Sequence, residues 1–484
     1  MTWWRRGVVY EAYPRSFLDT DSDGVGDLRG VTAQLPYLRW LGVDAVWLTP
    51  IYPSPQRDFG YDITDHTAID PQFGTLEDFD ALVAAAHGHG LRVILDYVPN
   101  HTSDRHPWFR ERPDWYLWHD GPPPNNWISV FGGSAWEQVG ERSYYHAYLR
   151  EQPDLDWRNP EVRRAMYAVL EFWIARGVDG FRVDALRQLL KDPELVDNPP
   201  DPAYRPGEMP EYDSLLPVHT ADRDEVQEIV AEMRRVIGDE RVMIAEVYVP
   251  IERLVRYYGE DGRGAQLPFN FHLISTPWRA EDIGALIDRY EAALPDGAWP
   301  TWVLGNHDRS RVASRVGAAQ ARVAAMLLLT LRGTPTLYYG DEIGMADVPI
   351  PPERVVDPGA ARDPVRTPMQ WTASGGFTDG EPWLPYGDLA VNVADQRNDP
   401  RSMLTLHRRL LALRQAFVEE DYETLHAGDG VLAYRRGERT AVALNLTGEP
   451  RPLPVSGDVV LSTYLDGAGG GATLRADEGL VLRI

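Results

Sequence analysis

The sequence predicts an α/β fold whose largest part is a TIM (β/α)8 barrel. Eight short segments with the composition of β-strands recur between residues 8 and 339, and most of them precede a stretch with helical periodicity. Alternating strands and helices are typical of a parallel sheet, and eight such units are enough to close a barrel. The predicted strands cover residues 8–17, 45–49, 92–98, 180–184, 242–246, 269–273, 302–306 and 336–339.

The segments between these strands divide into helices and inserts. Residues 101–158, after the third strand, are rich in Trp, Tyr, Pro and Gly and contain no helix of normal length. We therefore predict an inserted B domain at 101–158, within a catalytic barrel formed by residues 1–100 and 159–418. Long loops are predicted at 197–217 and 348–398. Apolar residues at helical spacing predict helices over 76–89, 160–176, 224–237 and 315–331.

The last part of the chain follows a different pattern. A predicted helix over 401–417 precedes segments in which apolar and polar residues alternate. Alternation with a period of two is typical of half-buried antiparallel strands. Residues 419–484 are therefore predicted to form a C-terminal antiparallel β-sandwich domain.

Charge and cysteine content exclude several classes of function. The 484 residues include 48 cationic and 73 acidic side chains, a formal net charge of −25. Such an acidic surface repels phosphate backbones and anionic membranes, so neither nucleic acid nor a membrane is an expected partner. The absence of cysteine excludes disulfides, a thiolate nucleophile and Cys-ligated metals. No apolar signal segment is evident near the N-terminus, so we expect a cytoplasmic location.

An acidic residue ends each of three predicted strands: Asp184, Glu246 and Asp308. The carboxyl ends of barrel strands converge on one mouth, so we expect these side chains to meet although they are far apart in sequence. Taken singly, Asp184 or Asp308 could merely cap the helix that follows. The recurrence of the pattern at three strand ends favours a catalytic site.

The surroundings of the first two acids differ in sequence. Arg182 lies two residues before Asp184, so both side chains point to the same face of the strand, and the guanidinium is expected to lower the pKa of Asp184. Glu246 follows an apolar strand with no neighbouring cation, as suits a general acid. Glycoside hydrolysis requires two carboxyl groups, one of them protonated and the other ionised. Retention and inversion both remain open at this point.

Four ordered motifs in this sequence resemble those of the α-amylase superfamily, glycoside hydrolase family 13. They are residues 96–101 (DYVPNH), 180–185 (GFRVDA), 244–247 (IAEV) and 306–308 (NHD). Residues 366–371 (RTPMQW) and 152–157 (QPDLDW) are similar to segments of its α-glucosidase and oligo-1,6-glucosidase branch. The resemblance implies a retaining double displacement with Asp184 as nucleophile, Glu246 as acid/base and Asp308 as transition-state stabiliser.

The same resemblance implies a set of sugar-binding residues. Asp58 and Tyr61 would lie in the pocket for the terminal glucose, where Asp58 would pair with Arg366. A pocket closed in this way favours attack at the non-reducing chain end. The sequence departs from the family at Tyr148, where Phe is usual, and the insert is shorter between Phe131 and Tyr148. The complete implied set is Asp58, Tyr61, His101, Phe131, Tyr148, Gln152, Arg182, His307 and Arg366.

An Asp-rich loop near the N-terminus has the spacing of a calcium-binding loop. Carboxylates stand at relative positions 1, 3, 5 and 9, a glycine stands at position 6, and the residue at position 7 would offer its backbone carbonyl. Gly30 replaces the Glu that an EF-hand carries at position 12. We expect a structural Ca²⁺ or Mg²⁺ here and no cofactor for catalysis. The predicted ligands are Asp19, Asp21, Asp23, Val25 and Asp27.

The leading functional hypothesis is a retaining, exo-acting α-glucosidase that hydrolyses terminal α-glucosyl units of oligosaccharides or other small α-glucosides. Ala185, next to the nucleophile, favours the α-1,4 linkage by the same resemblance. A glucosyl-transferring or isomerising relative (trehalose synthase, sucrose isomerase or hydrolase) and an oligo-1,6-glucosidase remain alternatives. A non-catalytic scaffold of the same fold is disfavoured because the three acids are present.

Overall fold

A computed structural model describes residues 2–357, 361–467 and 471–484, and the TIM barrel is confirmed within them. Eight parallel strands form one sheet in the order β10-β11-β1-β2-β3-β7-β8-β9. β9 and β10 stand at the two ends of this order, and Leu267 and Val303 from them pack in one interior cluster. The strands are β1 (Val9–Ala12), β2 (Ala45–Leu48), β3 (Arg92–Tyr97), β7 (Gly180–Val183), β8 (Val242–Ala245), β9 (Leu267–Pro268), β10 (Thr301–Val303) and β11 (Thr334–Tyr338).

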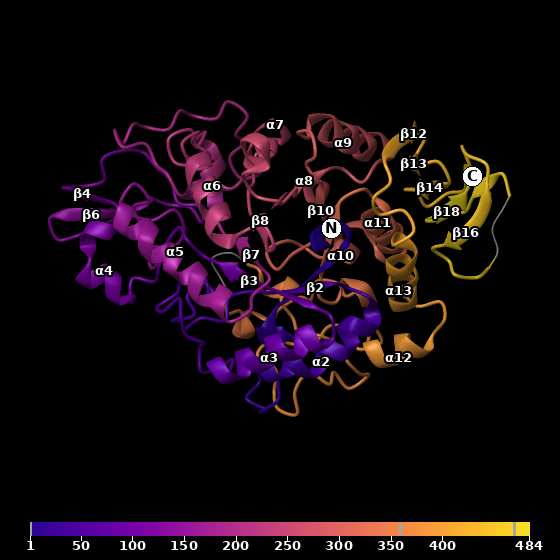
Figure 1. Cartoon of the computed structure of the whole chain (residues 1–484), viewed down its shortest axis with the longest axis horizontal. Helices are drawn as coiled ribbons and strands as arrows, with labels where there is room; N and C mark the ends of the chain where they lie inside the picture. The colour runs from indigo at the N-terminus through magenta and orange to yellow at the C-terminus, as the bar shows by residue number, and fades with distance from the viewer. Residues whose placement is uncertain (1, 358–360, 468–470) are drawn as a thin grey trace.

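Helices surround the sheet and separate its strands in sequence (Figure 1). The short helix α1 (Trp3–Arg6) precedes β1. Those that follow the successive strands are α2 (Leu28–Leu41), α3 (Leu76–Gly88), α5 (Pro160–Ala175), α6 (Val226–Ile237), α7 (Ile251–Leu254), α8 (His272–Ser275), α9 (Ala280–Ala293), α10 (Val312–Val316), α11 (Ala318–Thr330), α12 (Val393–Asn398) and α13 (Met403–Arg414).

Alternation along the strands divides the barrel side chains into two sets. On β3, Val93, Leu95 and Tyr97 pack toward the helices, whereas Ile94 joins the apolar cluster inside the barrel. Since side chains alternate with a period of two, Asp96 shares the inward face of Ile94. Glu11 on β1 lies inward beyond Val9 in the same way. A charged layer therefore lies above the apolar interior, at the carboxyl ends of the strands.

Three predicted elements differ from the structure. The strand expected at 8–17 ends at Ala12, and a 3-10 helix over Pro14–Ser16 follows it. The strand expected at 269–273 is wrong: β9 ends at Pro268, the Phe269 N–H adds one further bond to the Ala245 carbonyl (2.8 Å), and α8 begins at His272. The Asn270 side chain starts that helix by accepting a hydrogen bond from the backbone N–H of His272 (3.1 Å). The helix expected at 315–331 is divided into α10 and α11 because Gly317 takes a left-handed conformation (φ 83°).

The segment between β3 and α5 forms a small body of its own at one end of the molecule (Figure 1). It contains α4 (Pro107–Glu111) and an antiparallel sheet of β4 (Trp118–Asp120), β6 (Arg142–Tyr145) and β5 (Trp136–Val139). Trp127, Trp136 and Tyr145 form its apolar centre. This segment lies after the third strand, where the sequence predicts an inserted B domain.

The C-terminal residues form an antiparallel sheet at the opposite end of the molecule (Figure 1). Leu432 and Tyr434 pack against the main core, whereas Val431 and Ala433 face a second cluster that includes Leu474. The strands of this sheet, in order, are β12 (Tyr422–Gly428), β13 (Val431–Arg436), β14 (Thr440–Asn445), β18 (Gly479–Arg483) and β16 (Asp458–Ser462), with β15 (Arg451–Pro452) and β17 (Thr473–Leu474) forming a separate pair.

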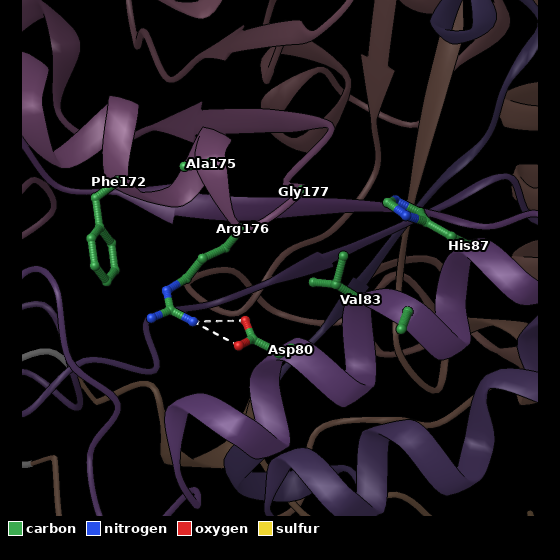
Figure 2. Close-up of a pocket in the computed structure, with 8 residues that line it drawn as sticks. Asp80, Val83, His87, Phe172, Ala175, Arg176 and Gly177 are labelled. Carbon is green, nitrogen blue, oxygen red and sulfur yellow. Dashed lines mark hydrogen bonds and ion pairs between the residues drawn. The ribbon is translucent and has the colours of Figure 1, made fainter.

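A surface depression of about 670 Å³ lies between α3 and α5 on the outer helical layer. Figure 2 shows Asp80 of α3 pairing there with Arg176, which follows α5, at 2.7 Å. His87 at its edge bonds Asp179 (2.7 Å), just before β7 begins. The depression therefore lies toward the amino ends of the strands, away from the charged layer. Among the described helices, none combines the length and apolar character that a membrane crossing requires.

Candidate active site

Arg182 is the centre of the charged layer at the barrel mouth. It stands on β7 opposite Asp96 of β3 in the sheet register, and its side chain is 1% exposed. One terminal guanidinium nitrogen, Nη1, lies 2.8 Å from Asp96 and 2.7 Å from Asp184, and the second, Nη2, lies 2.7 Å from Glu246. A single cation therefore holds three carboxyl groups together.

Asp184 and Glu246 extend directly from the ends of their strands. The Asp184 N–H bonds the Tyr97 carbonyl (2.8 Å), and the Glu246 N–H bonds the Val183 carbonyl (3.0 Å), so both residues continue the parallel ladders by one step. Ala185 then takes a left-handed conformation (φ 48°), and its N–H donates to Glu246 Oε2 at 3.0 Å. The bend after the strand thus fixes the second carboxyl group next to the first.

The pKa of Asp184 differs from the expectation. Burial raises the pKa of Asp184 well above its usual value, Arg182 acts against this rise, and Glu246 and Asp96 add to it. The expected lowering of the Asp184 pKa is therefore wrong, and Glu246, which has no cation beside it in the sequence, contacts Arg182. Burial is the main reason for the raised pKa, and one guanidinium that serves three carboxyl groups offsets it only in part.

Asp308 lies in a more positive environment after β10. Its Oδ1 accepts from Arg366 (2.9 Å) and Arg362 (3.3 Å), and its Oδ2 lies 3.3 Å from Nε2 of His307. Burial acts to raise the pKa of Asp308, but His307, Arg362 and Arg366 together hold it well below its usual value. Asp308 therefore stays ionised throughout the neutral and mildly acidic range.

The contacts of Asp58 correct one predicted pairing. Asp58 pairs with Arg362 (2.5 Å) and not with the predicted Arg366. It also accepts a hydrogen bond from the Gln152 amide (2.9 Å). Arg366 is used instead by Asp308 and by the His307 carbonyl (2.9 Å). Arg362, four residues earlier, bridges Asp58 and Asp308 and is oriented by Asp357 (2.7 Å).

The other predicted sugar-binding residues border the same space. Tyr61 stacks on His307 with ring centroids 5.5 Å apart, and the Gln152 amide lies 3.1 Å from His101 Nε2. Tyr148 contacts His101 and Phe131 ring to ring, at 5.3 and 5.9 Å. The structure therefore brings all twelve predicted catalytic and sugar-binding residues into one connected group.

Two members of this group were not predicted. Asp96 accepts from Tyr61 (2.9 Å) and Trp47 (3.2 Å) besides Arg182. Its signal was present in the sequence, because it is an acid on the inward face near the end of a strand. Arg362 lies in a long segment without periodicity, where no sequence pattern separates one arginine from another.

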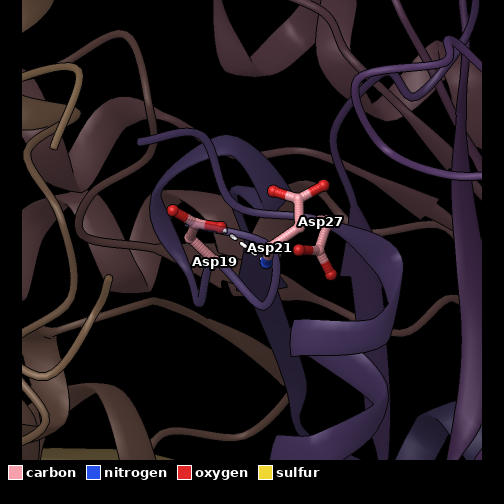
Figure 3. Close-up of side chains that lie close together, drawn as sticks. All are labelled: Asp19, Asp21 and Asp27. Atoms are coloured by element: carbon pink, nitrogen blue, oxygen red, sulfur yellow. Dashed lines mark hydrogen bonds between the residues drawn. The ribbon is translucent and has the colours of Figure 1, made fainter. Parts of the chain in front are cut away.

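The Asp-rich loop lies between β1 and α2. Figure 3 shows Asp19, Asp21 and Asp27 turned toward one another, with one carboxylate oxygen of each within 4.8 Å of the others. This donor set suits a hard divalent cation. Asp27 also caps α2 by accepting from the Gly30 N–H (2.7 Å). Asp23 lies outside the cluster, and its carboxylate accepts from the Val25 N–H (2.8 Å).

A TIM barrel whose mouth holds two adjacent carboxyl groups and a third beside arginine and histidine has the architecture of a glycoside hydrolase. The family model described as "Alpha amylase, catalytic domain" matches residues 11–421. A salivary alpha-glucosidase of Anopheles gambiae is 39% identical over 94% of this chain and 86% of its own length. An alpha-glucosidase of Apis mellifera is 40% identical over 89% of this chain and 82% of its own.

The structural comparison agrees with these relatives. The crystal structure of an alpha-glucosyl transfer enzyme superposes with a TM-score of 0.93 at 36% identity, and the match covers all of both chains. The chain therefore belongs to the α-amylase family, glycoside hydrolase family 13, and is a glycoside hydrolase.

Proposed function

We propose that this enzyme is a retaining α-glucosidase that removes the terminal non-reducing glucosyl unit of short α-glucosides. The observation that carries the proposal is the placement of Asp184 and Glu246 on the two terminal nitrogens of one buried guanidinium. Carboxyl groups held this closely suit attack by one of them on the anomeric carbon, whereas inversion needs room for a water molecule between them.

In the first step Glu246 gives its proton to the glycosidic oxygen while Asp184 attacks the anomeric carbon from the opposite face of the sugar. The product is a covalent β-glucosyl ester of Asp184. In the second step Glu246 removes a proton from water, which displaces Asp184 and restores the α configuration. Ionised Asp308 stabilises the positive charge that develops on the sugar ring in both steps.

The exo mode is supported by the pair of Asp58 and Arg362. Both side chains are almost fully buried, and together with Gln152 they link the second strand's loop, the insert and the loop after β11. A charged pair in this position suits recognition of the hydroxyls of a terminal glucose and leaves little room for a longer chain. The proposal includes a preference for the α-1,4 linkage, because the residue next to the nucleophile is Ala185.

Transfer of the glucosyl unit is the second candidate. It is favoured by the likeness to the alpha-glucosyl transfer enzyme, since the same intermediate passes glucose to whichever acceptor replaces water. Incubation with maltose, isomaltose, sucrose and trehalose in parallel, followed by NMR of the products, separates the candidates. An aryl α-glucoside, which contains a single glucose, reports the stereochemistry, and we expect it to release α-glucose first. Initial β-glucose from this substrate contradicts retention, and rearranged disaccharides in place of glucose from the four disaccharides favour isomerisation.

We also propose that the cluster of Asp19, Asp21 and Asp27 binds a structural Ca²⁺ or Mg²⁺. The donor set supports binding of the ion. The separation of these residues in sequence from the three catalytic acids supports a structural role. A cytoplasmic location stays a prediction, which fractionation of the host cells would test.

A further inference from the structure

The ring of His307 is buried, lies between two tyrosine rings and has a polar contact at each of its two nitrogens. It is 1% exposed and lies between Tyr13 and Tyr61, whose ring centroids are 6.0 and 5.5 Å away. Nδ1 lies 2.6 Å from Glu11 Oε1. Nε2 lies 2.9 Å from the Tyr61 hydroxyl and 3.3 Å from Asp308 Oδ2.

The hydrogen-bond partners of Tyr61 decide the state of Nε2. The Tyr61 hydroxyl has one hydrogen and lies 2.9 Å from both Asp96 Oδ2 and His307 Nε2. Asp96 is bound to Arg182 and also accepts from the Trp47 indole, so it is an acceptor for Tyr61 as well. The hydrogen between Tyr61 and His307 must then come from Nε2. A hydrogen on Nε2 can also point toward Asp308 Oδ2. Without it, a bare ring nitrogen and a carboxylate oxygen, both acceptors, would face each other.

With a hydrogen on Nε2, a neutral imidazole needs a donor at Nδ1, and Glu11 is the group in contact with it. Glu11 is fully buried, and its second oxygen has no hydrogen-bond partner among the residues described. A carboxylate with one unsolvated, unpaired oxygen is costly, whereas a neutral acid in the same position is not.

The surrounding charges agree with a neutral Glu11. Burial raises the pKa of Glu11 well above its usual value; Arg182 opposes this, while Asp308 and Asp96 add to it. Tyr338 of β11 is another titratable group that interacts with Glu11. Burial likewise lowers the pKa of His307, so the proton between the two groups belongs to Glu11.

We propose that Glu11 is a positioning residue, which as a neutral acid donates to His307 Nδ1 and so fixes the imidazole as the Nε2–H tautomer. That tautomer holds Tyr61 and donates toward Asp308 and the sugar hydroxyls beside it. The inference rests on the proposed function for its catalytic consequence. The hydrogen assignment itself is independent of the substrate.

Substitution of Glu11 tests the catalytic consequence. In Glu11→Gln the amide can donate to Nδ1 and cannot ionise, so we expect kcat/KM to stay within roughly threefold of wild type and to persist to higher pH. In Glu11→Ala the donor is lost, and we expect kcat/KM to fall on the order of 10- to 100-fold. Glu342→Gln is the matched control, because that carboxyl is equally buried but bonds Tyr10 and Tyr37 outside the site; its pH profile should not change.

If Glu11→Gln is as impaired as Glu11→Ala, the acid acts as an ionised carboxylate and the proposal is overturned. A second readout needs no turnover and therefore separates this failure from failure of the proposed function. In wild type with ¹⁵N-labelled histidine, the NMR signals absent from His307→Asn should show Nε2 protonated and Nδ1 unprotonated near neutral pH. A hydrogen on Nδ1, with Nε2 bare or also protonated, contradicts the proposal whatever the activity.

Discussion

At the scale of single residues, Arg182 decides the electrostatics of the site. Its one positive charge faces Asp96, Asp184 and Glu246, so the charged layer keeps an excess of negative charge when these acids are ionised. Positive charge that develops on a sugar ring would be stabilised there without rearrangement of the protein. Burial raises the pKa of Asp184, and this excess of negative charge adds to the rise.

Replacement of Asp96 by Asn should shift the acid side of the pH profile. The Asp96 charge contributes to the raised pKa of Asp184, so its removal lowers that pKa. Because the nucleophile must be ionised, activity then persists to lower pH, and we expect the acid limb of kcat/KM to move down by roughly half a pH unit or more. Asp179→Asn is the control: Asp179 lies at the amino ends of the strands, away from Asp184, so its replacement should leave the acid limb unchanged. An upward shift in Asp96→Asn would contradict this account of Asp184.

At the scale of elements, the loops after the strands depend on one another. The Asp-rich loop packs against the segment that follows Arg362 and Arg366 in sequence: Asp19 accepts from Thr378 (2.6 Å), and the Trp383 N–H donates to the Gly24 carbonyl (3.0 Å). An ion held by this loop would therefore also stabilise the segment that supplies both arginines of the sugar pocket.

Removal of the ion should lower thermal stability more than activity. An ion at 100 times its Kd stabilises the folded state by about 2.7 kcal/mol. We expect a chelator to lower Tm in wild type and added Ca²⁺ to restore it, with neither effect in Asp21→Ala. Asp296→Ala, an exposed aspartate outside the loop, should respond as wild type does. An unchanged Tm after chelation of wild type would show that the loop is stable without an ion.

The strand-end acids could be predicted from sequence because a barrel brings the carboxyl ends of all its strands to one place. Asp184, Glu246 and Asp308 follow from that rule alone. The pairing of Asp58 with Arg362 could not be predicted, since residues 348–398 have no periodicity to position a side chain. The charge balance around Arg182 was also missed, because a sequence shows the neighbours of a residue along the strand but not across the sheet.

At the scale of the whole molecule, the C-terminal sheet is part of the main core. Buried Arg436 of β13 donates to the carbonyls of Thr330, at the end of α11, and of Phe417, Val418 and Glu420. Burial lowers the pKa of Arg436 to about 10, so it is still charged at neutral pH. This one side chain therefore joins the last barrel helices to the C-terminal sheet.

Loss of Arg436 should destabilise the molecule without altering its chemistry. Arg436→Met leaves several buried carbonyls without a donor, and we expect a loss of about 2–4 kcal/mol in the free energy of unfolding, measured with urea. Arg435→Met removes only an exposed pair with Glu423 and should cost about 0.5 kcal/mol or less. Equal losses in the two variants would show that the sheet is not anchored through Arg436.

The central claim is that Asp184 forms a covalent bond to glucose while Glu246 transfers the protons. It is tested most directly by mass spectrometry of the enzyme treated with a fluorinated α-glucosyl fluoride, whose intermediate breaks down slowly. We predict a mass increase of one fluorinated glucosyl unit, located on the peptide that contains Asp184 and absent from Asp184→Asn. A label on any other residue, or turnover by Asp184→Asn at a rate near that of wild type, would contradict the assignment.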